Sequence, residues 1–248
     1  MIVSSIKSFG RYCLFMTQVF RAPDKWRVFG RQFVQEIYKL GVDSIPLVMI
    51  ISIFIGAVIA IQMTLNIDSP LIPAYATGMS TREILVLEFS SSMMCLILAG
   101  KVGSNIASEI GTMRITEQLD AMDIMGVNSA NFVVLPKLLG FVFFVPVLCI
   151  LSIFIGLFGG YLIAVFTSMF TVEHYIYGVQ MMFIPWHVYY ALIKTVIFAY
   201  MIVSVAAYYG YYVKGGAIDV GKASTNAVVS SSILILLFDV ILTKLLLQ

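Results

Sequence analysis

Charged residues are scarce in this 248-residue chain. Asp, Glu, Lys and Arg make up 11% of it, whereas hydrophobic residues make up 60% and the mean hydropathy is +0.99. Ordinary soluble domains carry about 25% charged and about 45–50% apolar residues. The composition therefore predicts an integral membrane protein, and a net charge of only +2 gives no reason to expect a nucleic-acid partner.

Motifs for metal binding and catalysis are also missing. Cys13, Cys95 and Cys149 lie far apart without CxxC spacing, which argues against a disulfide framework and a zinc site. His174 and His187, one on each side of a turn, are more typical of interfacial residues than of metal ligands. The chain has no GxxxxGK[ST] phosphate-binding loop, no HExxH and no GxSxG with suitable partners. We therefore expect no catalytic site, metal or bound cofactor in this chain.

The first 42 residues are charged and amphipathic. Two apolar stripes at helical spacing, one from Ile2 to Phe20 and one from Trp26 to Leu40, flank Pro23, which can start a new helix. Basic residues occupy the other faces, and the continuous apolar core of a cleavable signal peptide is missing. Because such helices lie in the membrane interface, we expect residues 1–42 there, with a soluble helical pair as the alternative.

Five apolar stretches follow, each long enough to cross a bilayer, which takes roughly 20 residues. We expect spans at about 44–66, 83–106, 132–166, 186–212 and 225–246. The third is longer than necessary and carries residues that predict a tilted, kinked or broken helix: Pro136, Pro146, Gly156, Gly159 and Gly160. The predicted fold is an all-α integral membrane protein, with an interfacial segment over 1–42 and a five-span domain over 43–248.

Lysine and arginine indicate the orientation. If the N-terminus is inside, the outer segments keep only Arg82 and Lys244. The inner side then holds the seven basic residues of 1–42 and also Lys101, Arg114, Lys137, Lys214 and Lys222. Because basic residues favour the cytoplasmic side, we expect a cytoplasmic N-terminus and a C-terminus on the opposite side.

A polar stretch over residues 109–127 interrupts the apolar runs on the cytoplasmic side. Ile115, Leu119 and Met122 recur at helical spacing, and an acidic line on a neighbouring face consists of Glu117, Asp120 and Asp123. The pattern predicts one short amphipathic helix whose apolar line packs on the membrane domain. A plain solvated loop helix is the alternative.

Three ionisable residues, Glu88, Lys194 and Asp239, lie within predicted spans. Each costs at least about 2.5–3.5 kcal/mol at the bilayer centre unless it is paired or hydrated. Counted along the helices, all three lie roughly 7–12 Å below the outer face, so Lys194 can pair with either carboxylate. They form either a structural ion pair or, with Gln62, a polar patch in an outward-opening cavity that suits a zwitterionic or anionic headgroup.

The longest recognisable strings are AGKVGS at residues 99–104 and ASEIGTMRITEQLDAMDIMGV at residues 107–127. Shorter ones lie at 29–33, 193–199, 215–217 and 220–225. Together they resemble the MlaE-type (YrbE-type) permeases of ABC transporters that work with MCE-domain proteins, whose pattern is close to AGRxGSxxxAEIGxMxxxEQxDALxxMGVDP. The resemblance covers nearly the whole chain.

The chain departs from the family pattern in the second span. The family's Arg-Glu corresponds to Leu87-Glu88, and its Gly-Pro corresponds to Ser90-Ser91. Lys194 is then the only cation of the charged layer, and the loss of proline should straighten the helix. After the polar stretch, the family's Asp-Pro is Asn128-Ser129.

The resemblance implies a homodimeric permease subunit of the bacterial inner membrane, without a catalytic site of its own. A separate cytoplasmic ATPase would hydrolyse the ATP, and a small accessory protein could bind to that ATPase. A periplasmic MCE-domain protein would continue a phospholipid path between the inner and outer membranes, and so serve outer-membrane lipid asymmetry. The lipid-binding residues would be Glu88, Lys194, Gln62, Asp239, Phe89 and Phe198. The coupling helix over 109–127 would contact the ATPase through Glu109, Arg114, Glu117, Gln118, Asp120 and Asp123.

Two other functions compete with this one. An ion-coupled secondary transporter would use Glu88, Lys194 and Asp239 as a proton relay. Such transporters usually have internal repeats and more spans, and neither is detected in this sequence. A membrane enzyme that acts on lipids is disfavoured by the missing nucleophile and base.

Overall fold

The computed structural model describes residues 2–21, 26–67, 73–167 and 169–247. These residues form helices and no strand, and five of the helical stretches are long and apolar enough to cross a membrane. The all-α membrane fold predicted from the sequence is therefore confirmed.

Two of the five long stretches are built from several helical segments. The first, Trp26–Asn66, consists of α2 (Trp26–Glu36), η1 (Ile37–Gly41), η2 (Val42–Ser44) and α3 (Ile45–Asn66). The second, Ala76–Ile115, consists of α4 (Ala76–Ile84), η3 (Leu85–Met93), α5 (Met94–Leu98), η4 (Ala99–Gly103) and α6 (Ser104–Ile115). The other three are the single helices α8 (Ser129–Phe166), α10 (Pro185–Tyr211) and α11 (Ala217–Leu247).

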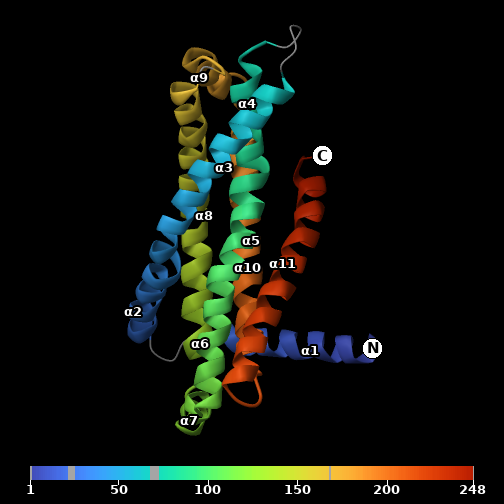
Figure 1. The fold of residues 1–248 in the computed structure, drawn as a ribbon. Coiled ribbons are helices and arrows are strands. Elements are labelled where there is room, and N and C mark those ends of the chain that lie inside the picture. The colour runs from blue at the N-terminus through green and yellow to red at the C-terminus, as the bar shows by residue number, and fades with distance from the viewer. Residues whose placement is uncertain (1, 22–25, 68–72, 168, 248) are drawn as a thin grey trace.

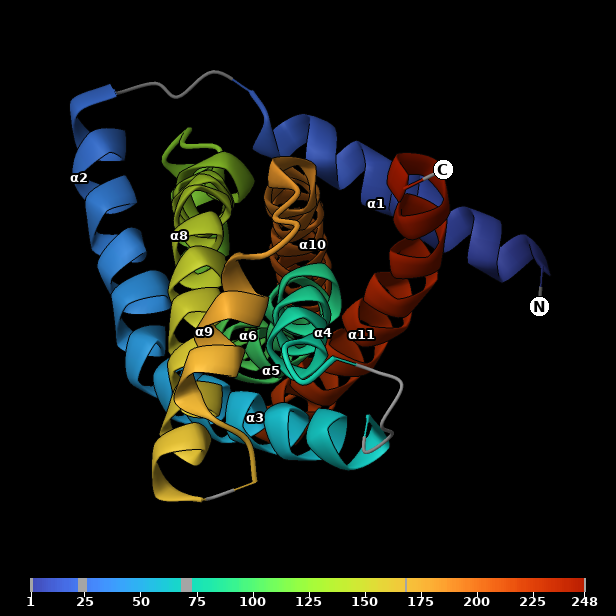
Figure 2. The ribbon, with the colours of Figure 1, turned by 90° about the horizontal axis from the view of Figure 1, so that it is seen from above.

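Three shorter helices lie at the two ends of the bundle (Figure 1): α1 (Ile2–Val19), α7 (Gln118–Ile124) and α9 (Val172–Gln180). Helix α1 crosses the bundle near the end that carries α7, and α9 lies at the opposite end beside α4. We call these the α7 end and the α9 end. Seen from above, α10 and the α4–α6 stretch lie between α8 and α11 (Figure 2), so they form the centre of the bundle.

The predicted single helix over 109–127 is wrong. The second long stretch continues to Ile115, and α7 begins only at Gln118. Between them Glu117 adopts a left-handed conformation with φ 60° and ψ 14°, which interrupts the α-helix. The spacing of the apolar line did not reveal this break, because it falls between two members of the series, Ile115 and Leu119.

Two other boundaries differ from the prediction. Helix α2 runs into α3 through η1 and η2, so the structure has no break between residues 42 and 43, and the interfacial placement of 1–42 stays a prediction. Helix α8 is one continuous helix of 38 residues, so the broken-helix alternative is wrong. A proline removes one backbone donor, and helices in membranes tolerate this where neighbours pack around them.

Two glycines of α8, Gly156 and Gly159, lie against the backbone of α3. Small buried residues recur at four-residue spacing on both helices: Ser52, Gly56 and Ala60 on α3, and Ser152, Gly156 and Gly160 on α8. A Cβ atom on Gly56 would lie 1.9 Å from the carbonyl oxygen of Gly156. The hydroxyl oxygens of Ser52 and Ser152 are 2.9 Å apart. This is the small-xxx-small contact by which membrane helices bring their backbones together.

Replacing Gly56 by alanine tests this contact. Alanine favours a helix by about 1 kcal/mol over glycine. At Gly56, however, its methyl group collides with the backbone of α8. We therefore expect the free energy of unfolding to fall by about 1–3 kcal/mol overall. The matched control is Gly30→Ala, since a Cβ on Gly30 meets nothing within 4 Å. Unfolding of the detergent-solubilised protein measures both, and equal stabilities would show that the close contact is unimportant.

Candidate functional site

The ammonium group of Lys194 is fully buried at the centre of the charged layer. Its Nζ lies 2.5 Å from Oδ1 of Asp239 on α11 and 3.7 Å from Oε1 of Glu88 on η3. It donates to the Tyr190 hydroxyl at 2.9 Å and to the Leu87 carbonyl at 3.2 Å. The structure therefore brings together the three ionisable residues singled out in the sequence, with Asp239 as the direct partner.

The Leu87 carbonyl belongs to η3, which is π-helical. In a π-helix the backbone bonds run from i to i+5, and such turns frequently mark functional positions in membrane and soluble helices. The same carbonyl also accepts from the Ser91 hydroxyl at 2.9 Å. The η3 segment departs from α-helical geometry although this chain has Ser90-Ser91 and no proline there, and the straightening of the helix stays a prediction.

Glu88 is the accessible group of this layer. The ammonium group of Lys194 has three N–H donors, and Asp239, the Tyr190 hydroxyl and the Leu87 carbonyl accept from them. Asp239 also accepts from Ser92 at 2.6 Å, whereas the Glu88 side chain is 47% exposed. The layer therefore presents a carboxylate, not a cation, to an approaching molecule.

The other predicted lipid-binding residues lie elsewhere. Gln62 is exposed on α3. Phe89 is buried beside Ile59 and Leu85, and Phe198 is fully buried in the main core. Contact of these three residues with a lipid stays a prediction. Among the described residues, no group of three or more His, Cys, Asp or Glu is placed to hold a metal ion.

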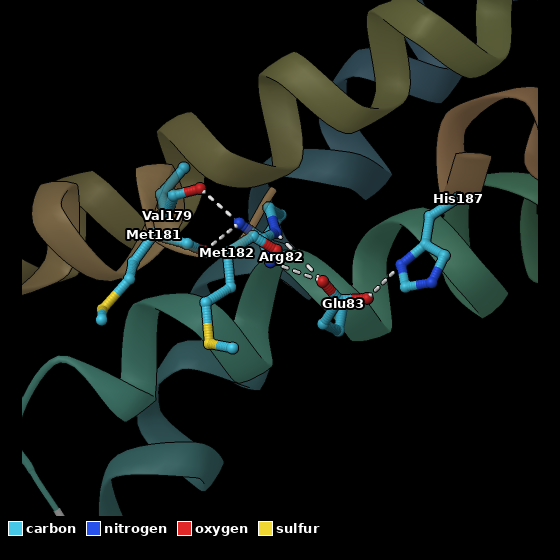
Figure 3. A network of polar contacts seen from close by, with 6 residues as sticks. All are labelled: Arg82, Glu83, Val179, Met181, Met182 and His187. Carbon is cyan, nitrogen blue, oxygen red and sulfur yellow. Dashed lines mark hydrogen bonds and ion pairs between the residues drawn. The ribbon is translucent and has the colours of Figure 1, made fainter. Parts of the chain in front are cut away.

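A second polar network lies at the α9 end, and the sequence reasoning missed it (Figure 3). The buried Arg82 side chain donates through Nη1 to the carbonyls of Val179 (2.8 Å) and Met181 (2.7 Å), and through Nη2 to the carbonyl of Met182 (3.2 Å). Nε and Nη2 also donate to Oε1 of Glu83, at 3.2 and 2.5 Å. All five guanidinium N–H groups are thus used.

Arg82 holds the C-terminal end of α9 on α4, since these carbonyls belong to the last turn of α9 and the residues that follow. Basic side chains commonly satisfy carbonyls at helix C-termini. The second oxygen of Glu83 lies 2.7 Å from Nδ1 of His187 in the first turn of α10. The sequence feature that could have indicated this network is the pair Arg82-Glu83 at the start of the second predicted span.

At the α7 end, a third cluster surrounds the buried ammonium of Lys137 on α8. Its Nζ lies 2.6 Å from Glu36 of α2 and 3.0 Å from Glu109 of α6, and Glu109 also pairs with Lys39 at 2.7 Å. Glu109, predicted to contact an ATPase, is therefore part of α6 and is engaged inside the bundle.

The remaining predicted coupling residues lie on or beside α7. Arg114 pairs with Asp120 at 2.5 Å across the break, and Asp123 accepts from the backbone N–H of Ser129 at 3.1 Å. Glu117 and Gln118 are exposed. Asp120 and Asp123 thus hold α7 in place, although both are also accessible at the surface.

The predicted apolar line, which starts at Ile115 at the end of α6 and continues through Leu119 and Met122 of α7, packs inward. Leu119 is fully buried, and Ile115 and Met122 pack against buried hydrophobic clusters. Two further apolar residues were missed: Ile124 and Met125 are 87% and 72% exposed at the C-terminal end of α7. Exposed apolar side chains next to each other at a helix tip are typical of an interaction surface.

The pairing order within the charged layer can be tested by neutralising each carboxylate. We expect Asp239→Asn to lower the free energy of unfolding by about 3 kcal/mol, because it leaves the buried ammonium without its direct partner. Glu88→Gln should cost less than about 1 kcal/mol, since Glu88 is farther away and half-exposed. SDS titration in mixed micelles measures both, and similar losses would contradict the assignment of Asp239 as the main partner.

Comparison with known proteins identifies the family of this chain. The family described as permease MlaE matches residues 33–245. A probable ABC transporter permease protein of Rickettsia bellii is 32% identical over 247 residues, covering 96% of this chain and 92% of the relative. The intermembrane phospholipid transport system permease protein MlaE of Haemophilus influenzae is 30% identical over 213 residues, covering 85% and 80%. The chain is a multi-pass membrane protein that belongs to the MlaE permease family.

Proposed function

We propose that this chain is the transmembrane subunit of an ABC transporter that moves phospholipids between the inner and outer membranes, driven by a separate ATPase. The observation that carries the proposal is the charged layer, in which an accessible Glu88 lies beside a buried Lys194 within an apolar bundle. A carboxylate at this depth costs free energy unless it meets a polar ligand or water. The Haemophilus relative, named for intermembrane phospholipid transport, supports a lipid as that ligand.

The ATPase would bind at the α7 end. Helix α7 is held to α6 and α8 by the Arg114–Asp120 pair and by the contact of Asp123 with Ser129, so a force on α7 reaches both long helices. Its exposed tip, Ile124 and Met125, offers the apolar contact, and Glu117 and Gln118 offer a polar rim. ATP would be bound and hydrolysed by the partner, without a catalytic step in this chain.

A second copy and a periplasmic protein complete the proposed assembly. Helix α11 carries a long exposed apolar face, including Ile233, Leu236, Leu237 and Val240, which a second copy can cover in a homodimer. An MCE-domain protein would bind at the α9 end, and a small accessory protein would bind the ATPase. In this proposed assembly the N-terminus would lie in the cytoplasm and the C-terminus on the periplasmic side of the bacterial inner membrane.

Polar substitutions at the tip of α7 test the coupling role. We expect Ile124→Asp combined with Met125→Asp to reduce co-purification of the ATPase at least tenfold, because burying an unpaired charge in an apolar contact opposes binding. The matched control is Ile218→Asp, which changes another highly exposed isoleucine, outside α7. If the doubly substituted protein retains the ATPase as well as the control does, the tip of α7 is not the contact.

Transport in vesicles tests the function itself. We expect transfer of a fluorescent phospholipid out of proteoliposomes that contain the permease, its ATPase and the MCE-domain protein, and we expect ATP to be required. The ion-coupled alternative instead predicts transfer along a pH gradient by the permease alone. Transfer of that kind, without any need for ATP, would replace the proposed function by a secondary transporter.

A further inference from the structure

A groove separate from the charged layer lies where α1 crosses α10 and α11 (Figure 2). Its volume is about 360 Å³, which falls within the usual range of small-molecule sites. All three helices contribute to its wall, which includes Tyr12 of α1, Tyr200, Met201 and Val205 of α10, and Leu234 and Phe238 of α11. The groove therefore joins an amphipathic helix at the α7 end to two long helices of the bundle.

The hydroxyl groups of this groove pair with one another. Tyr12 donates to the Ser204 hydroxyl at 2.9 Å, and the hydroxyl oxygens of Tyr209 and Ser230 are 2.9 Å apart. The surface left to an occupant is almost entirely apolar. A polar molecule would lose its hydrogen bonds to water there without replacing them, whereas an acyl chain loses none.

Arg11 brings a positive charge to the edge of the groove. Its guanidinium carbon lies 5.7 Å from the centre of the Tyr212 ring, and that ring is 5.1 Å from the ring of Tyr208, which lines the groove. Lys7 lies one helical turn before Arg11, so both are on the same face of α1, and both are exposed. Tyrosine and basic residues of this kind are typical of the membrane interface.

No acidic residue opposes these charges in the sequence of the groove helices near the groove. Residues 2–19, 200–209 and 230–238 contain neither Asp nor Glu. Asp239, which follows the groove on α11, lies 2.5 Å from Lys194 and is engaged there. The groove thus combines an apolar wall with a positively charged edge, which complements a lipid whose headgroup carries a net negative charge.

We propose that this groove binds an anionic phospholipid, with an acyl chain between α10 and α11 and the phosphate beside Arg11 and Lys7. The lipid belongs to the leaflet next to the α7 end and stays bound, so it is distinct from a transported substrate at the charged layer. Because its headgroup contacts α1 and its chain contacts α10 and α11, it fastens α1 to the bundle. This inference goes beyond the proposed transport and does not depend on it.

Site-specific photo-crosslinking tests the groove. The full-length protein carries a photo-reactive diazirine side chain at Leu234 and is reconstituted alone in vesicles of equimolar phosphatidylglycerol and phosphatidylcholine. We expect phosphatidylglycerol to crosslink at least fivefold more, because each basic side chain near a membrane surface favours an anionic lipid about fivefold. Replacing Lys7 and Arg11 together by glutamine should make the two lipids crosslink equally.

The matched control replaces Arg27 and Arg31 of α2 by glutamine. These are also exposed basic residues at four-residue spacing, on the other amphipathic helix, and the preference for phosphatidylglycerol should persist. A further variant, Met201→Trp, fills part of the groove and should lower crosslinking of both lipids about tenfold, since the acyl chain no longer fits.

Three results would overturn the proposed groove site. The first is equal crosslinking of the two lipids in protein that is otherwise unsubstituted, or an equal loss of preference in the α2 control. The second is undiminished crosslinking in Met201→Trp, which would place the acyl chain outside the groove. The third is a crosslink from Leu234 to a second copy of the chain in place of lipid. Lipid transport stands apart from these results, because it is measured with the ATPase and ATP.

Discussion

A buried ammonium group needs partners wherever it lies in an apolar bundle, and Lys194 determines how three helices meet. Its direct partner Asp239 comes from α11, and the Leu87 carbonyl and Glu88 come from η3. A slide of α10 by one residue would separate Lys194 from all of these groups. A slide of α11 would remove Asp239, and a slide of η3 would remove the Leu87 carbonyl and Glu88. Buried ion pairs are weak evidence for stability, because desolvation offsets their attraction, but they are well suited to specifying register.

The same principle recurs at each end of the bundle. Arg82 joins α4 to the end of α9 and, through Glu83, to α10, whereas Lys137 joins α8 to α2 and α6. Lys137 meets groups from two other helices directly, whereas Arg82 meets α9 directly and reaches α10 only through Glu83. Between the charged levels the helices contact through apolar and small residues, most closely where Gly56 of α3 meets Gly156 of α8. The bundle is thus held in register at three levels and packed closely between them.

The accessibility of each charged group matters more to function than its presence. Lys194 and Arg82 have the charge to bind a headgroup, but both are buried and their donors are used. Glu88 and His187 lie beside them and remain accessible. The buried cations therefore orient the carboxylates next to them, and the partly exposed residues are those that a ligand can reach.

Much of the fold was predictable because a membrane imposes strong constraints on composition. Runs of about 20 apolar residues identified five spans, and the cost of intramembrane charge singled out Glu88, Lys194 and Asp239 before any contact was known. Finer features were not predicted from the sequence. The break at Glu117 depends on one backbone conformation. The burial of Leu119 and the exposure of Ile124 depend on how α7 packs against α6 and α8.

The sequence alone determined that this is an all-α membrane protein of five spans, since hydrophobic length and charge patterning act locally along the chain. It also identified the residues of the charged layer and, through long motif strings, the family. Only the tertiary structure decided that Lys194 pairs with Asp239 and that all N–H donors of Arg82 are used. It also decided that Glu83 meets His187, which is 104 positions away in the chain. These outcomes depend on distances between side chains from different helices, and such distances exist only once the helices have packed.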